Sequence, residues 1–169
     1  MHSNCRQGAG AERWPVSAFS VESLVENYEA PVTKLREGAF NLVMRGLIAF
    51  EVDKGLWMVP PQCALWIPGG MARSFRSSGS LEFCGLLIAP EVTRKFPREC
   101  CTMAVSPLLR ELVIATAQLP KPYTESRATR AFVLADAIRW TSAQDCGCAS
   151  PYALRSRDNR RMGTPYRYE

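Results

Sequence analysis

Residues 55–70 read GLWMVPPQCALWIPGG, and this stretch decides the fold class. Two short apolar runs, residues 56–59 and 63–67, are separated by Pro60-Pro61 and closed by Pro68-Gly69-Gly70. Proline has no backbone N–H to give to a neighbouring strand, so each run is predicted to be a short strand that ends at a turn. Short strands with Pro and Gly between them are typical of an all-β sandwich or barrel.

The strand pattern continues upstream of this stretch. Residues 40–52 alternate in hydropathy, with the even positions from Leu42 to Val52 on one side and the odd positions on the other. This alternation predicts a strand or a bent strand pair with one buried face, and Gly46 in its middle indicates a bulge or bend. Asp53-Lys54-Gly55 is a tight-turn signal, so a hairpin is expected there. Residues 18–24 are predicted to form a first strand, and residues 27–36 a connector with extended pieces.

Downstream, two further strands are predicted at residues 71–76 and 81–88, separated by a turn at Ser77-Ser78-Gly79. Strands then recur every 8–12 residues or so, with turn residues between them. No strand–helix–strand unit and no glycine loop for a phosphate is present in the pattern.

The character of the sequence changes after Pro97. Ser106-Pro107 opens a helical pattern, because serine caps a helix and proline fits its first turn. Apolar residues recur at helical spacing through Leu119, and Pro120-Lys121-Pro122 ends the pattern. A second helix is predicted at about residues 125–140. The expected organisation is thus a barrel over residues 17–98 and a helical hairpin over 99–140.

Both ends of the chain differ from this patterned middle. Residues 1–16 are aperiodic, and we expect a disordered lead-in. Residues 141–169 contain a single member of the Leu, Ile, Val, Phe and Trp set, Leu154, and are predicted to be a disordered tail.

Composition excludes several classes of function. Twenty-one Lys and Arg against 16 Asp and Glu give a net charge of +5, partly carried by the two ends, so the middle is no dedicated nucleic-acid surface. The only histidine is His2, which excludes a His base, a Ser-His-Asp triad or a multi-His metal site in the middle. No apolar run is long enough to span a membrane, and no secretory signal is visible. The seven cysteines are interpreted as reduced thiols in a cytoplasmic protein, with Cys63 and Cys84 as small core residues.

The stretch 55–70 resembles the core of the sensor domain in AraC-type transcriptional regulators, many of which read G-x-W-x-V-P-P-x-x-A-x-W-I-P-x-G. Residues 105–112, VSPLLREL, are similar to the opening of that family's first helix. The resemblance covers about residues 17–138. It implies a mainly β fold, namely a cupin-like (jelly-roll) barrel that binds an effector, followed by a C-terminal helical hairpin. In the family, the helices dimerise the protein and lead to a DNA-binding domain with two helix-turn-helix motifs.

The chain departs from the family at its metal-ligand positions. Where many members carry a His-x-His, a Gln and a later His, the aligned residues here are Leu35 and Glu37, Asn41, and Arg73. All three imidazoles are replaced, so neither a metal nor another cofactor is expected in the barrel. Glu37, Asn41 and Arg73 are instead predicted to bind a polar effector, since charged groups fix carboxylate or sugar-like ligands by charge-assisted hydrogen bonds. In the alternative interpretation, Glu37 and Arg73 form a pair at the rim of the barrel or facing solvent, which would contribute little to stability.

Two tryptophans on adjacent predicted strands complete the candidate pocket. Trp57 is predicted to line it. The competing interpretation for Trp57 and Trp66 is core packing, with the indole N–H bonded to a backbone carbonyl.

The predicted helices carry apolar residues on more than one side, and such surplus apolar surface usually meets a partner. The expected interface of a C2 homodimer is formed by Leu108, Leu112, Phe132 and Ile138. The alternative is that this stripe simply covers the barrel.

The resemblance implies the effector-sensing and dimerisation module of an AraC-type regulator. We expect no enzyme, because the sequence contains no nucleophile–base pair or paired carboxylates that support catalysis. Residues 141–169 contain no helix-turn-helix pattern, so we expect no direct DNA binding by this chain and interpret the abrupt tail as truncation or frameshift of a longer regulator. The alternatives are a small cupin enzyme, an isomerase or dioxygenase that depends on a bound metal, and a dimerisation protein with a filled barrel.

Overall fold

Two long antiparallel strands, β3 (Gly38–Val52) and β6 (Ala72–Ile88), form the spine of the protein. The structure, a computed structural model, describes residues 15–23, 27–52, 55–118 and 153–155. The remaining elements are β1 (Val16–Ser23), β2 (Glu29–Lys34), β4 (Gly55–Val59), β5 (Cys63–Ile67), the short 3-10 helix η1 (Thr93–Lys95), β7 (Cys101–Ala104), α1 (Pro107–Ala117) and β8 (Ala153–Arg155).

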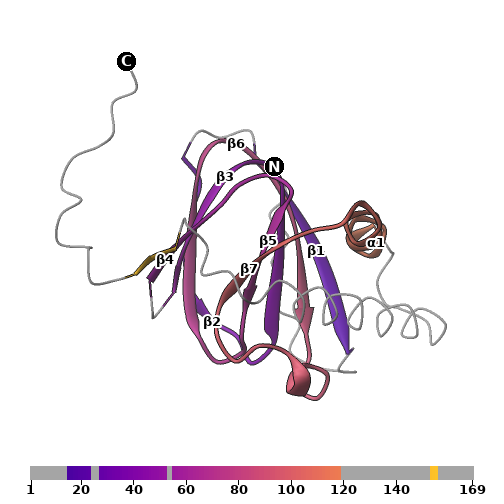
Figure 1. Ribbon diagram of the computed structural model, residues 1–169. Coiled ribbons are helices and arrows are strands. Elements are labelled where there is room, and N and C mark those ends of the chain that lie inside the picture. Colours follow the sequence, from indigo (N-terminus) through magenta and orange to yellow (C-terminus); the bar gives the residue numbers. More distant parts are fainter. Residues whose placement is uncertain (1–14, 24–26, 53–54, 119–152, 156–169) are drawn as a thin grey trace.

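The other strands add to this spine in two separate groups. One half contains β7, β5, the first part of β3, the last part of β6, and β1; the other contains β8, β4, the last part of β3, the first part of β6, and β2. Figure 1 shows β3 and β6 arching over from one half to the other, so that the halves face each other. The mainly β, cupin-like barrel expected from the sequence is thereby confirmed.

The arch is made at Gly46, as its position in the sequence indicated. Gly46 has φ +87°, and the register of β3 against β6 shifts on both sides of Arg45. Only glycine adopts this backbone conformation without steric cost, and an added Cβ would also press on the Ser80 carbonyl oxygen. Gly79, with φ +76°, lies on the opposite part of β6. The bend therefore belongs to the backbone of both spine strands.

The bend also reverses which residues of β3 face inward. Odd positions such as Ala39 and Val43 belong to the inner cluster before Gly46, whereas even positions such as Phe50 and Val52 belong to it afterwards. The predicted assignment of all even positions to one face was therefore wrong for the first part of the strand. There Phe40 packs against the outer cluster instead, so both faces are buried.

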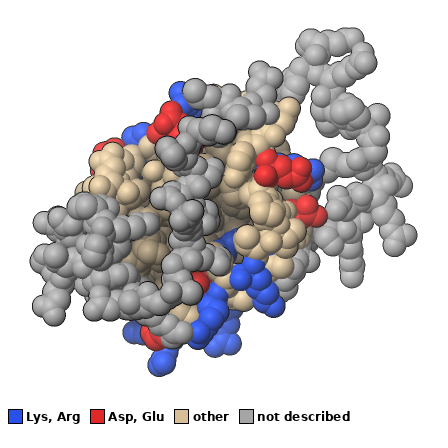
Figure 2. All heavy atoms as spheres, turned by 180° about the vertical axis from the view of Figure 1, so that it is seen from behind, with Lys and Arg blue, Asp and Glu red and all other residues tan. Residues whose placement is uncertain are grey.

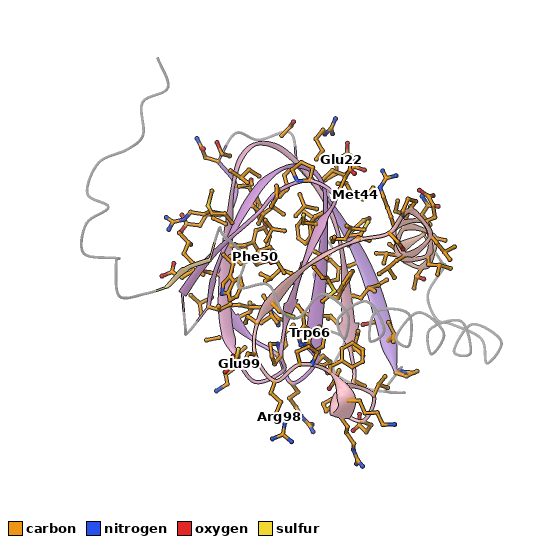
Figure 3. The ribbon with its side chains drawn as sticks, in the orientation of Figure 1. Glu22, Met44, Phe50, Trp66, Arg98 and Glu99 are labelled. Carbon is orange, nitrogen blue, oxygen red and sulfur yellow. The ribbon has the colours of Figure 1, made fainter. Side chains whose placement is uncertain are left out.

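The inner cluster lies between the two halves. Its rings make edge or tilted contacts: Phe75 lies 5.2 Å from Phe83 and 5.6 Å from Phe50, and Phe19 lies 5.9 Å from Phe83, centroid to centroid. Such aromatic pairs add to the free energy gained by burying their apolar area. Phe50 is labelled in Figure 3.

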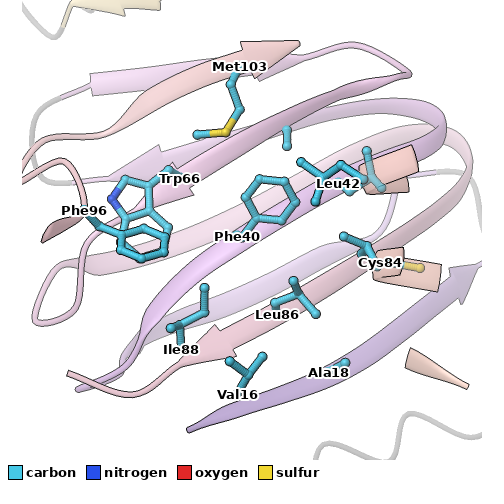
Figure 4. Close-up of a cluster of buried hydrophobic side chains, with 13 residues drawn as sticks. Val16, Ala18, Phe40, Leu42, Trp66, Cys84, Leu86, Ile88, Phe96 and Met103 are labelled. Carbon is cyan, nitrogen blue, oxygen red and sulfur yellow. The ribbon is translucent and has the colours of Figure 1, made fainter. Parts of the chain in front are cut away.

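A second cluster lies on the outer face of one half, beneath α1 (Figure 4). Leu109 and Val113 of α1 are buried in it, and the helix packs over β1 and β6. As predicted, Ser106 caps α1 by accepting a hydrogen bond from the Leu109 N–H, and Pro107 occupies the first turn. Burial also raises the pKa of the Cys84 thiol in this cluster, which keeps it neutral and suits the predicted role as a core residue.

Three parts of the chain differ from the expectation. The predicted turn at 77–79 is absent, because β6 runs unbroken from Ala72 to Ile88. The predicted connector at 27–36 contains β2, which pairs with β6. The sheet also extends past residue 98, where the barrel was expected to end, since β7 pairs with β5.

The ends of the chain are only partly described. Within the tail expected to be disordered, Ala153–Arg155 forms β8 beside β4. The second predicted helix at 125–140 and the lead-in at 1–14 lie outside the described residues. Within the described part, no helix has the length and apolar character that a bilayer crossing requires.

The packing of α1 gives a stability prediction. Leu109→Ala is expected to lower the free energy of unfolding by about 2–5 kcal/mol, because it leaves a cavity beneath the helix. Arg110→Ala, a partly exposed neighbour whose ion pair with Glu111 lies at the surface, should change it by about 0.5 kcal/mol or less. Chemical denaturation of both variants measures the difference, and equal losses would contradict the described packing.

Candidate functional site

Arg73 is the most unusual polar residue of the barrel. Only 8% of it is exposed, and its Nη1 atom is buried without any hydrogen-bond partner. Its register partner on β3, Val52, belongs to the inner cluster, and side chains opposite each other on paired strands share a face. The guanidinium therefore extends from the inner face of the barrel and is not solvent-facing, whereas the alternative of a pair at the rim is left open.

Burial is the main electrostatic influence on Arg73. It lowers the pKa of the guanidinium, and the nearby Glu37 carboxylate and Cys100 thiol partly offset this lowering. An arginine stays charged at neutral pH even so. Among the described residues, no carboxylate forms an ion pair with Arg73. Its charge is thus attracted by Glu37 but not paired with it.

Glu37 lies half-buried at the end of the barrel opposite the bend. There the turn between β2 and β3 meets the turn between β5 and β6, since the Gly70 N–H donates to the Leu35 carbonyl at 2.8 Å. Gly69 packs so closely on the backbone of Arg36 that a Cβ would collide with it. The structure thus brings Glu37 and Arg73 to the same end of the barrel.

Asn41 is buried on the inner face of the other half. Its amide nitrogen donates to the Leu65 carbonyl at 3.4 Å, a long hydrogen bond. Asn41 pairs with Gly85 on β6 and Leu65 on β5. It therefore faces the interior of the half that does not contain Arg73.

The two tryptophans have different roles. Trp57 is half-buried against the inner cluster, opposite Phe50 on β3. Trp66 faces the outer cluster, where it packs on Phe96 and its indole N–H donates to the Pro97 carbonyl at 2.9 Å. Core packing is thus the correct interpretation for Trp66, and only Trp57 remains a candidate for the pocket.

Ser77 is a polar residue of the interior that sequence reasoning missed. It is 6% exposed, and its Oγ atom has no hydrogen-bond partner. Its register partner on β3 is Ile48, a member of the inner cluster. The sequence predicts a turn at Ser77, so it does not indicate that Ser77 and Arg73 share a strand. The signal in the sequence is their spacing of four residues, because alternate residues of a strand lie on the same face.

Charge is distributed unevenly over the surface. In Figure 2, Lys and Arg side chains gather over the lower part of the face shown. Arg98 lies at the lower end in Figure 3, below Trp66, whereas Glu22 lies at the bend. By register, Lys34 is also at the Arg73 end, since it pairs with Ala72. This end of the barrel therefore carries exposed charges of both signs, among them Lys34, Arg98 and Glu99.

The described residues hold no group of three or more His, Cys, Asp or Glu side chains that could bind a metal ion. Of the predicted dimer residues, Leu108 is 72% exposed and Leu112 is partly buried against the outer cluster. Phe132 and Ile138 lie outside the described residues.

The fold is similar to that of known solved structures. It matches the crystal structure of the AraC-like transcriptional activator CuxR with a TM-score of 0.52 at 13% identity, covering 85% of this chain and 59% of that one. It matches unsaturated fatty acid-bound ToxT from Vibrio cholerae with a TM-score of 0.52 at 7% identity, covering 90% and 65%. The fold is thus that of AraC-like transcriptional regulators.

The sequence adds a particular relative. The chain is 40% identical over 100 residues to the HTH-type transcriptional regulator NimR of Escherichia coli (strain K12). The match covers 59% of this chain and 36% of that regulator, so the chain spans about a third of its relative's length. No family model matches the chain. The resemblance to AraC-type regulators seen in the sequence is confirmed by this homologue and by the fold.

The unpaired guanidinium gives a second prediction. Arg73→Met is expected to raise the free energy of unfolding by about 1–3 kcal/mol, because it removes a buried charge without a partner and keeps the volume of the side chain. Arg76→Met, on an exposed position of the same strand, should have little effect. Urea denaturation of the two variants decides the matter, and a strong loss of stability in Arg73→Met would mean that the charge is well paired.

Proposed function

We propose that this chain is the effector-binding and dimerisation module of an AraC-type transcription regulator, and that it binds a small molecule inside the barrel. The observation that carries the proposal is Arg73, a buried guanidinium with an unsatisfied Nη1 beside a largely apolar cluster of inner side chains. A buried donor without a partner costs free energy, and it is retained where a ligand satisfies it. In this proposal Glu37, Asn41 and Trp57 line the same interior.

The relatives support this proposal. NimR is a transcriptional regulator, and ToxT has been crystallised with an unsaturated fatty acid bound. A ligand that binds one conformation of the barrel more tightly shifts the population toward it. The α1 helix, packed on the outer face of β6, would then carry the change to an associated helix-turn-helix unit.

A small cupin enzyme is the second candidate, and the same relatives weigh against it. Its activity would depend on a bound metal, and no cluster of metal-ligating side chains lies among the described residues. Metal analysis together with turnover assays of the purified protein would distinguish the two functions.

Ligand binding is tested by a thermal-shift screen of organic acids, sugars and heteroaromatic compounds. A compound that binds the folded protein should raise Tm by about 5–10 °C at a hundredfold excess over Kd. The shift should shrink in Trp57→Leu, on the inner wall of β4, and persist in Met58→Leu, whose side chain points to the opposite face. A library without any hit, or hits that ignore Trp57, would contradict binding inside the barrel.

Dimerisation through α1 is tested with two exposed apolar residues. Leu108 on α1 and Val32 on β2 are each 72% exposed. Leu108→Glu is expected to convert a dimer into a monomer of 18.8 kDa in sedimentation velocity, because it buries a charge in the interface, whereas Val32→Glu should leave the dimer intact. A monomeric wild-type protein at tens of micromolar would rule out this part of the proposal.

A further inference from the structure

We infer that Arg73 and Ser77 bind the two ends of one elongated ligand, which carries a carboxylate-type oxyanion at one end and a hydroxyl or carbonyl oxygen at the other. The inference rests on the proposed function, since it names the chemical class of the effector. Within the described part of the chain, Arg73 Nη1 and Ser77 Oγ are the buried side-chain polar atoms that lack a hydrogen-bond partner.

Both atoms belong to one row of side chains. Arg73, Phe75 and Ser77 are alternate residues of β6, and they pair with Val52, Phe50 and Ile48 of β3, which are all in the inner cluster. Side chains at alternate positions of a strand leave the same face. The two unsatisfied groups therefore border the same interior space, with Phe75 between them.

The wall between the two polar groups is apolar and largely aromatic. Phe75 contacts the rings of Phe50, Phe83 and Tyr28, the last at 5.7 Å between centroids. The Ser77 backbone N–H is already used, because it donates to the Tyr28 carbonyl at 2.8 Å. Only the Ser77 hydroxyl is left for a ligand. A sugar, which needs polar partners around its whole ring, fits this wall less well than an apolar body with polar ends.

The chemistry of the two groups determines which end of the ligand lies at Arg73 and which lies at Ser77. A guanidinium has only donors and matches the two oxygens of a carboxylate, whereas a serine hydroxyl both donates and accepts. Four residues of strand separate the Cα atoms by about 13 Å. The exposed Lys34 and Arg98 lie at the same end as Arg73, together with the exposed Glu99, so the buried guanidinium itself decides where the anion binds. The anionic group therefore belongs at Arg73 and the neutral oxygen near the bend.

Isothermal titration calorimetry of the full chain tests the inference with matched probes. The probes are para-coumarate and ω-hydroxydecanoate, each beside its hydroxyl-free acid (cinnamate, decanoate) and its hydroxylated amide. Replacing the carboxylate by the amide should weaken binding about 10- to 100-fold, and removing the hydroxyl should weaken it about 2- to 10-fold.

Variants then assign each preference to its residue. Arg73→Met should abolish the preference for acid over amide, and Ser77→Ala the preference for the hydroxylated acid. Arg76→Met and Ser78→Ala, the exposed neighbours on the same strand, should preserve both preferences.

Equal affinity for acids and amides, or binding by none of the probes, would overturn this inference. Neither result touches the proposed function, which fails only if the wider thermal-shift library yields no ligand of the barrel. A preference for acids that survives Arg73→Met would also overturn the inference about Arg73 and Ser77, because the oxyanion would then be bound elsewhere.

Discussion

The pairing of β3 with β6 along nearly their whole length is the constraint on which the rest of the structure depends. A straight pair would make a flat sheet with one buried face. Because both strands bend, at Gly46 and near Gly79, the same pair supplies the middle of both halves of the barrel. Every other strand is placed by joining one edge of this bent pair. The inner cluster forms, and Arg73 is buried, only because the two halves face each other.

Much of the fold was predictable from the sequence, because its signals are local. The proline and glycine turns of residues 55–70 fixed the short strands β4 and β5, Gly46 indicated the bend, and Ser106-Pro107 marked the start of α1. The continuity of β6 was not predictable, since Ser77-Ser78-Gly79 is a strong turn signal in isolation. Tertiary pairing with β3 on one side and with β1 and β2 on the other overrides that local preference.

The candidate site was predicted in part for the same reason. Alignment with the family motif singled out Glu37, Asn41 and Arg73, and all three lie at least half-buried, as binding residues should. The missing information was which side of the bend each residue faces, because a register shift in β3 changes the face of every residue beyond it. Hydrogen-bond satisfaction is likewise a property of the folded protein, so a serine with an unpaired hydroxyl cannot be told from an ordinary one in the sequence.

The two clusters share the backbone of the same strands. In the half of the barrel that α1 covers, successive residues of β3 and β6 belong to different clusters. Phe40 and Leu86 pack beneath the helix, whereas Ala39 and Leu87 border the interior. The two sets do not overlap, although they interleave residue by residue. Substitutions at one set of positions therefore reshape the inner lining of the barrel, while the other set preserves the seat of the helix.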